Sequence, residues 1–586
     1  MRTTRPILAC VLVLAIAPAA WSGSTLSAIA DGSAPDPAAA DAAFEAFLAA
    51  ADPRDADAFR TPAARHALVH LLDRAGDDRL RLPAARLLHR NPALAEALGL
   101  LVRPEDDAAA VCRTLIELHE AHGPMLDDYA PLAAALAVVH DGEFASRINE
   151  NTAVADPPAA LFAFFARPAR ELALDPRRTP PELLIHVVDA ASPVSELRWA
   201  QNRYAGDNNV GGRFFDIDYD HAHTGGAPKA LTQAGFSLGN ILAFGGVCAD
   251  QAYFAATVGK AIGVPTAYVR ASGLDVGHAW VGFLRQRGRR ADWDFDSGRY
   301  DEYQGLTGSL RCPQRREWTT DAALGVTASL ANLSLEDRAR AEALAHAARR
   351  LAALLDAGQS LPEPDADAET KPRAAPLDDH AESALLLVER SLRTSAATLD
   401  AWEVLARLGA SGAMDLGQTK RWAGVVDRLG TPRSLDFRIG VLAELVAGVA
   451  DPAECSRLLD RLTRMCGRRL DLRGRIRLEQ GDLWRDAGDV RKAYRCYEAS
   501  IDDLITVSRA VIQPLRRAEA LLRDHGETDA VLPIYERTFS ELTRPDWGGA
   551  FLRGSAWYAV GREYARVLRE HGRTRDAERL ERQLGP

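Results

Sequence analysis

Residues 245–252 read GGVCADQA and mark the start of an apolar run in the middle of the chain. Two glycines precede Cys248, which opens an apolar run that continues to Ile262 and ends at Gly263-Val264-Pro265, a helix stop signal. The run predicts a helix with Cys248 in its first turn. Unpaired N–H groups and the helix dipole favour an anion there, so the position suits a thiolate nucleophile.

Three strands are predicted directly after this helix. They cover residues 265–270 (PTAYVR), 278–284 (HAWVGFL) and 291–296 (ADWDFD), which are rich in β-branched and aromatic residues. The second strand begins at His278, and the third presents alternating aspartates on one face: Asp292, Asp294 and Asp296. A cysteine, a histidine and an aspartate at element boundaries can supply the nucleophile, the base and the orienting group of an activated thiol.

Residues 195–315 resemble the transglutaminase-like superfamily of papain-like cysteine enzymes. The resemblance rests on GGVCxDxA at 245–252, on AxGVPTxYV at 261–269, on GHAWV at 277–281 and on the aspartate strand that follows. It implies a papain-like α+β domain in which the helix bearing the cysteine packs on an antiparallel sheet.

The same resemblance implies a role for each member of a triad. Cys248 would be the nucleophile, His278 the base, and an aspartate the group that orients the imidazole. Asp296 is favoured because it opens the turn after the strand, as the family residue does, and Asp294 is the alternate. The spacing from Trp293 departs from the family pattern, so the choice between the two aspartates stays open.

The donors of an oxyanion hole are less visible in the sequence. The N–H group of Cys248 itself is one candidate, and an upstream side-chain amide, from Asn240 or Gln233, is the other. Either amide is better explained as an ordinary loop residue.

An acidic run with two histidines lies between the N-terminal region and the cysteine, at 214–226 (FFDIDYDHAHTGG). Its oxygen and nitrogen groups are weak candidate ligands for a cation, Ca²⁺ first. The spacing is not diagnostic of a metal site, and a half-exposed strand or a loop lining the cleft explains it as well. The acyl-transfer chemistry itself requires no cofactor. The candidate ligands are Asp216, Asp218, Asp220, His221 and His223.

The N-terminus is typical of a secretory signal. A positively charged start precedes the apolar run Ile7 to Ala20, and small residues follow. Ala28-Ile29-Ala30 supplies the favoured cleavage site and Ala17-Pro18-Ala19 the alternative. We therefore expect residues 1–30 to be a signal peptide and the protein to be exported, to the periplasm or the medium. No later segment reaches the length of a transmembrane helix.

Periodicity and composition predict that the chain is a multidomain α+β protein, and they suggest where its domains begin and end. Residues 31–185 are predicted to form a helical domain, because apolar residues recur there at helical spacing, and 186–320 the catalytic domain. Residues 321–356 are predicted to be a helix that packs on or leaves the catalytic domain. Residues 357–380, rich in proline and acids, are predicted to be a flexible linker, and 381–586 helical hairpin repeats.

The C-terminal region contains one recognisable repeat pattern. Residues 481–497, Gly481-x-x-Trp484-x-x-x-Gly488-x-x-x-x-Ala493-x-x-x-Tyr497, resemble a tetratricopeptide repeat, in which small residues allow paired helices to approach. Similar glycines recur at unequal spacing at 526 and 572. A degenerate solenoid of this kind typically presents a concave face to a protein partner.

Length and charge exclude a single-domain protein and argue against a nucleic-acid-binding protein, and the motifs above are compatible with two functions. A chain of 586 residues is too long for one core, and a net charge of −10 without a basic cluster argues against nucleic-acid binding. The first function is an exported cysteine enzyme that transfers an acyl group from an amide of a protein or peptide, by hydrolysis, deamidation or cross-linking. The alternative is a non-catalytic transglutaminase-like scaffold whose repeats bind a protein or peptide partner.

Overall fold

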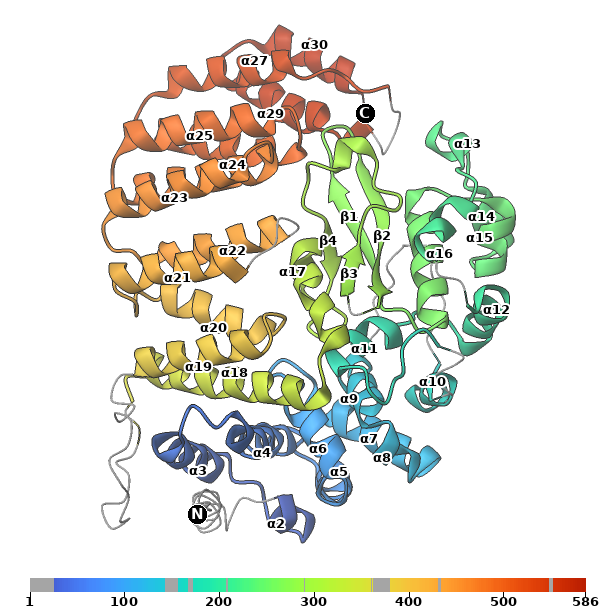
Figure 1. Cartoon of the computed structure of the whole chain (residues 1–586). Coiled ribbons are helices and arrows are strands. Elements are labelled where there is room, and N and C mark those ends of the chain that lie inside the picture. The colour runs from blue at the N-terminus through green and yellow to red at the C-terminus, as the bar shows by residue number, and fades with distance from the viewer. Residues whose placement is uncertain are drawn as a thin grey trace.

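The computed structural model is a predominantly helical protein with one small antiparallel sheet, which is compatible with the predicted α+β class (Figure 1). The predicted signal peptide, up to residue 25, and most of the predicted linker lie outside the described residues. The structure describes residues 26–142, 156–166, 172–206, 209–288, 290–359, 361, 380–429, 434–546 and 552–585. None of the described helices is both long enough and apolar enough to cross a membrane.

The N-terminal part is a helical array. Aspartate side chains cap the first turn of several of its helices, as at Asp36 and Asp107, which satisfies N–H groups that would otherwise lack partners. Every residue of α9 (Ala130–Val139) is buried, so this helix forms the centre of the array. The helices are α2 (Leu26–Ala30), α3 (Pro37–Ala50), α4 (Ala56–Arg74), α5 (Asp78–Arg90), α6 (Pro92–Gly99), α7 (Ala108–His122), α8 (Met125–Asp128) and α9 (Ala130–Val139).

The short helix α2 packs on α5. Its residues Leu26, Ile29 and Ala30 are buried, and Arg86 Nε donates a hydrogen bond of 2.9 Å to the Ala30 carbonyl. Cleavage of a signal peptide after Ala30 would remove these contacts, whereas cleavage after Ala19 would retain them.

Short helices lead from the array to the helix that bears Cys248. The apolar core of the array continues into this helix through Phe254 and Val258, so no break in the core separates the first two predicted domains. The connecting elements are α10 (Pro158–Phe165), α11 (Pro181–Val188), α12 (Val194–Tyr204), the 3-10 helix η2 (Gly211–Asp216), α13 (His221–Thr224), α14 (Ala230–Ala234) and α15 (Leu238–Phe244), and they are followed by α16 (Cys248–Ala261).

The sheet has five antiparallel strands in the order β3-β2-β1-β4-β5. Small residues of α16 pack on one face of it, against Ala279 and Val281 of β2. The opposite face packs Trp280 and Leu284 on α17 (Asp321–Val326) and the 3-10 helix η4 (Thr327–Asn332). The strands are β1 (Thr266–Ser272), β2 (Gly277–Arg287), β3 (Arg290–Asp294), β4 (Ser309–Arg311) and β5 (Trp318–Thr320).

The long helix α18 (Leu335–Asp356) joins the array to the repeats. It lies against α4 on one side and against α19 and α20 on the other, and one apolar core spans all four helices. The helices that follow are α19 (His380–Thr394), α20 (Leu399–Ala410), α21 (Leu416–Leu429), α22 (Leu435–Ala447), α23 (Pro452–Cys466), α24 (Leu470–Asp486), α25 (Val490–Leu504), α26 (Ile512–Asp524), α27 (Val531–Glu541), α29 (Ala556–Glu570) and α30 (Thr574–Leu584).

The segment that resembles a tetratricopeptide repeat forms the hairpin of α24 and α25. Gly488 lies in its turn at a φ of 77°, a conformation that favours glycine. A Cβ atom at Gly481 would lie only 2.3 Å from the Tyr497 ring, so a small residue is required where the two helices meet.

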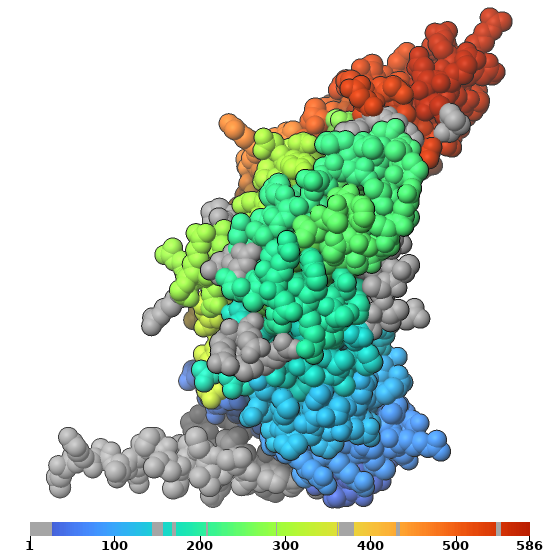
Figure 2. Space-filling model, turned by 90° about the vertical axis from the view of Figure 1, so that its right-hand side faces the viewer, coloured from blue at the N-terminus to red at the C-terminus, as the bar shows by residue number. Residues whose placement is uncertain are grey.

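The repeats curve around the sheet, and they contact segments next to its strands from the middle of their arc and from near its C-terminal end (Figure 1). Ala556 N donates to the Leu274 carbonyl at 2.8 Å in the β1–β2 turn, and Thr307 Oγ1 donates to Asp436 at 2.6 Å. A cavity of about 710 Å³ lies between the repeats and β5. Figure 2 shows a different face, where the segment around α12–α16 is exposed between the blue array and the red end of the repeats.

Candidate active site

Cys248 is the first residue of α16, as predicted, and buried charges hold the start of this helix in place. Asp250 accepts a hydrogen bond of 2.8 Å from Val247 N and one of 2.9 Å from Lys229 Nζ. Asp250 is fully buried and Lys229 nearly so. The preceding glycine loop is fixed as well, because Gly246 N donates to the Asp218 carbonyl at 3.0 Å. The hydrogen bonds of Asp250 and of Gly246 therefore fix the backbone on both sides of Cys248.

The backbone N–H groups of Ala279, Ala249 and Cys248 itself lie near enough to the Cys248 sulfur to act to lower the pKa of the thiol. Burial nevertheless raises the pKa of the Cys248 thiol above its ordinary value; these N–H groups oppose the shift, and the charge of Asp250 adds to it. The prediction that the helix start lowers this pKa is wrong for the resting protein, because burial outweighs the helix terminus. The resting group is a thiol that a base has to deprotonate.

His278 is the second residue of β2, and its ring is oriented by a backbone carbonyl. Nε2 donates a hydrogen bond of 2.6 Å to the Gly298 carbonyl, so in the neutral ring the proton is on Nε2 and Nδ1 is the basic nitrogen. Burial lowers the pKa of His278, opposed by the Gly298 carbonyl and by the charge of Glu302. His278 is therefore neutral near pH 7, the state that a general base requires.

The Cys248 sulfur lies beside the start of β2, the strand that carries His278. The N–H group that β2 directs at the sulfur is that of Ala279, the residue next to His278. A thiolate at Cys248 also raises the pKa of Tyr300, in addition to the larger effect of burial, which places this tyrosine near the sulfur. The Tyr300 ring stacks on His278 with 4.5 Å between ring centroids.

Tyrosines surround the site, and the sequence did not single them out. The Tyr303 ring lies 4.7 Å from that of His278, and its hydroxyl donates to the Val276 carbonyl at 3.0 Å. Burial, with the charge of Cys248 second, raises the pKa of Tyr219 to about 12. Tyr219 and Tyr300 are far apart in sequence, and no local pattern joins them, so only the fold reveals this aromatic rim.

The structure does not place either predicted aspartate on His278. Asp294 is paired with Arg285 at 2.5 Å and accepts a hydrogen bond from Asp296 N, while the Asp296 side chain is exposed. Within the described part of the chain, no hydrogen bond joins either carboxylate to His278. The carbonyl of Gly298, two residues after Asp296, occupies the position opposite Nε2 instead.

Gly298 is specifically suited to this role. Its φ is 80°, in the left-handed region that favours glycine, and a Cβ atom there would lie 2.6 Å from the Phe214 ring. The turn after β3 thus directs a carbonyl rather than a carboxylate at the histidine.

The two side-chain candidates for the oxyanion hole are engaged elsewhere or exposed. Asn240 Nδ2 donates to the carbonyls of Ala234 and Gly235, each at 2.9 Å, and so caps the end of α14. Gln233 lies exposed on α14. The backbone N–H groups of Cys248 and Ala249, which lie near the reacting sulfur, remain the candidate donors of an oxyanion hole.

The acidic run before the cysteine does not form a cluster of metal ligands. Asp216 pairs with Arg213 at 2.6 Å, and Asp220 caps α13 by accepting from His223 N at 2.9 Å. His223 Nδ1 lies 2.9 Å from the Ala227 carbonyl. Asp218 and His221 join no such group either: among the described residues, the one group of three ligand side chains within reach of a common ion is Asp41, His66 and His70.

Comparisons of the chain with protein-family models, with curated proteins and with solved structures find no match.

Proposed function

We propose that the protein is an exported cysteine enzyme with a transglutaminase-like, papain-like catalytic domain, and that it transfers acyl groups from amides of a protein or peptide substrate. The observations that support the proposal are that Cys248 begins α16 with the Ala279 N–H of β2 near its sulfur, and that His278, the preceding residue of β2, is an imidazole held by the Gly298 carbonyl. A buried thiol in a merely structural role would need neither the N–H groups nor the oriented base.

In the proposed reaction, Nδ1 of His278 takes the proton of Cys248 as the sulfur attacks the carbonyl carbon of the substrate amide. The oxygen of the tetrahedral intermediate accepts hydrogen bonds from the N–H groups of Cys248 and Ala249. The imidazolium is stabilised by the Gly298 carbonyl and by the charge of Glu302. Its proton then passes to the leaving nitrogen as the C–N bond breaks, and a thioester remains on Cys248.

Water or an amine then attacks the thioester and regenerates the thiol. Attack by water gives hydrolysis of a peptide bond or deamidation of a side chain, and attack by an amine gives a cross-link. Exposed aromatic side chains near the cysteine loop favour a substrate with apolar groups beside the reacting amide. Phe244, which directly precedes that loop, is 52 % exposed, and Phe215 is 62 % exposed.

The test incubates the purified protein with casein, with and without a fluorescent primary amine, and compares it with Cys248→Ala. New peptides indicate hydrolysis, ammonia without new peptides indicates deamidation, and bound fluorescence indicates cross-linking. The proposal predicts at least one of these products with the unmodified protein and none with Cys248→Ala. Equal amounts of all three products in both proteins would refute it.

A second candidate function, a scaffold that binds a partner through its repeats, is favoured by the cavity of about 710 Å³ on their inner side. Apolar side chains of Trp402 and Phe437 line it together with Glu444. This function predicts that Cys248→Ala still binds casein and that Trp402→Ala does not. Binding that is unchanged in Trp402→Ala would contradict it.

A further inference from the structure

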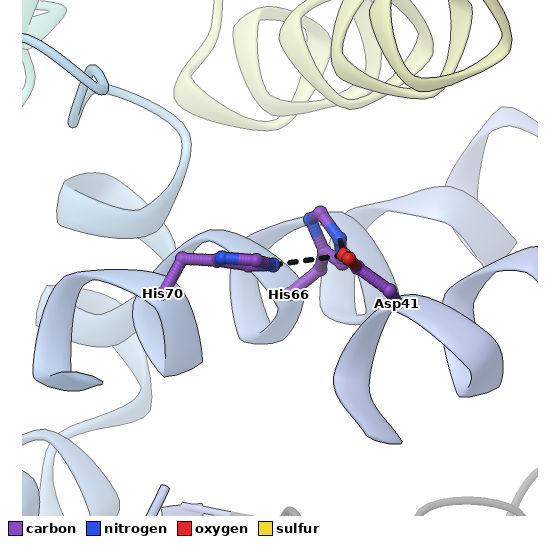
Figure 3. Close-up of side chains that lie close together, drawn as sticks. All are labelled: Asp41, His66 and His70. Carbon is purple, nitrogen blue, oxygen red and sulfur yellow. Dashed lines mark hydrogen bonds and ion pairs between the residues drawn. The ribbon is translucent and has the colours of Figure 1, made fainter. Parts of the chain in front are cut away.

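A cluster of imidazoles and one carboxylate lies in the N-terminal array, remote in sequence from the thiol. His66 and His70 are one turn apart on α4, so their side chains lie on the same face of the helix. Asp41 faces them from α3. Figure 3 shows the three side chains pointing toward one another across the gap between the two helices.

The geometry is that of three ligands around one point. Both His66 Nε2 and His70 Nε2 lie 2.8 Å from the same oxygen, Asp41 Oδ1, and all three atoms are within 4.8 Å of one another. Zinc binds imidazole nitrogen and carboxylate oxygen at about 2.0–2.2 Å, usually in tetrahedral geometry. Slight separation of the two imidazoles would admit such an ion, which leaves a fourth position for water.

Access and orientation also fit an ion site. The side chains of Asp41 and His70 are 26 % and 31 % exposed, so an ion can enter, whereas His66 is 9 % exposed. His66 Nδ1 lies 2.9 Å from Nε2 of His346 on α18. A metal-bound His66 would carry its proton on Nδ1 and donate it to His346, the kind of outer contact that orients histidine ligands.

The guanidinium of Arg350 lies against the cluster and pairs with two carboxylates. Arg350 approaches the other oxygen of Asp41 at 3.2 Å and is also paired with Glu45. Two carboxylates and one guanidinium leave the site with net negative charge when the imidazoles are neutral. The pairing leaves Asp41 Oδ1 directed at the histidines.

We propose that Asp41, His66 and His70 bind a divalent first-row transition ion, for which Zn²⁺ is the first probe. Two nitrogen ligands and one oxygen ligand favour an ion of this class over Ca²⁺ or Mg²⁺, which prefer oxygen alone. Because His346 and Arg350 belong to α18, the ion would link α3 and α4 to the helix on which the repeats pack. The proposal does not depend on the acyl-transfer chemistry.

The test titrates Zn²⁺ into the full chain by calorimetry, in a Cys248→Ala background so that the reactive thiol cannot contribute. We expect one bound equivalent and a rise in the thermal midpoint with Zn²⁺ concentration. Asp41→Asn and His70→Gln should each weaken binding at least tenfold. The matched control is His89→Gln, which changes an exposed histidine of α5 and should leave binding unchanged.

His70→Gln separates the metal site from a merely structural cluster, because its amide can still donate to Asp41. A structural role alone predicts no stoichiometric Zn²⁺ binding. Co²⁺ provides a second readout that needs no variant: a bound ion with nitrogen and oxygen ligands gives visible absorption without thiolate charge transfer. The proposal would be overturned by absence of stoichiometric binding, by affinity that both variants leave unchanged, or by a thiolate spectrum.

Discussion

His278 and the histidine pair His66 and His70 have different hydrogen-bond partners. At the candidate active site, His278 contacts a backbone carbonyl and aromatic rings, and no carboxylate among the described residues is bonded to it. In the N-terminal array, a single aspartate oxygen lies between His66 and His70. The first environment keeps one imidazole neutral and leaves one nitrogen free for a proton. The second brings two imidazole nitrogens to one oxygen, an arrangement suited to binding rather than to proton transfer.

The largest effect that distinguishes the two groups is expected for His278→Ala. Loss of a general base typically costs about 10²–10⁴-fold in rate. We expect a decrease in that range in the rate at which p-nitrophenyl acetate acylates Cys248, followed by stopped-flow absorbance. The matched control is His89→Ala, which removes an exposed imidazole. It should change the acylation rate less than about twofold, as expected for a surface substitution away from the site. Equal rates in His278→Ala and the unmodified protein would contradict the role of His278.

Asp41→Ala should destabilise the array. It removes the acceptor of two histidine side chains, which should cost about 1–3 kcal/mol in the free energy of unfolding. Urea denaturation followed by circular dichroism measures this change. Burial of Asp41 acts to raise its pKa, but hydrogen bonds from His66 and His70 and the charge of Arg350 lower that pKa well below its usual range.

The same aspartate makes a pH-dependent prediction. A folded-state pKa below the unfolded value stabilises the protein above about pH 4, and this contribution is lost as the pH falls. The difference in stability between the unmodified protein and Asp41→Ala should therefore shrink on acidification. A difference that grows below pH 4 would contradict this environment for Asp41.

The acylation rate should also depend on pH in a way that reports on His278. The base form exists above the pKa of His278, which burial lowers from an ordinary value of 6.5. Acylation should therefore decline only below about pH 6.5, by about tenfold per unit at most. Direct alkylation of Cys248 by iodoacetamide should still increase above pH 9, because the pKa of this thiol is raised. A plateau of alkylation below pH 7 would show a resting thiolate and refute this part of the account.

The smallest effects are expected at the aspartates of β3. An orienting carboxylate in a catalytic triad can contribute about 10⁴-fold in rate. Because the Gly298 carbonyl holds His278 here, Asp294→Asn and Asp296→Asn should each change the acylation rate by no more than about threefold. If either variant loses as much activity as His278→Ala, that aspartate reaches the histidine during the reaction.

The sequence predicted the helix and the first three strands of the central region closely, because their signals are local. The apolar run from Cys248 was expected to end at Ile262 and forms α16, which ends at Ala261. Strands β4 and β5 were missed because three residues are too few for alternation to be visible. The continuous core from the array into α16 was also not predictable, since it joins residues far apart in the chain.

The candidate site was predictable only where residue type alone carries the chemistry. Cys248 and His278 fall into this group. The partner of His278 is a carbonyl, which every residue possesses, and its direction depends on the left-handed backbone at Gly298. The Asp41 cluster was missed because Asp41 lies on α3 and both histidines lie on α4. Asp41 and His66 are 25 residues apart in the chain, so no local pattern joins them.

The most direct test of the central claim is the intact mass of the protein after brief exposure to p-nitrophenyl acetate near pH 7, with peptide mapping of the adduct. We expect one acetyl group on Cys248 in the unmodified protein, much slower formation in His278→Ala, and none on that residue in Cys248→Ala. Acetylation of Cys248 at the same rate with and without His278, or no adduct on Cys248, would contradict an activated thiol at this site.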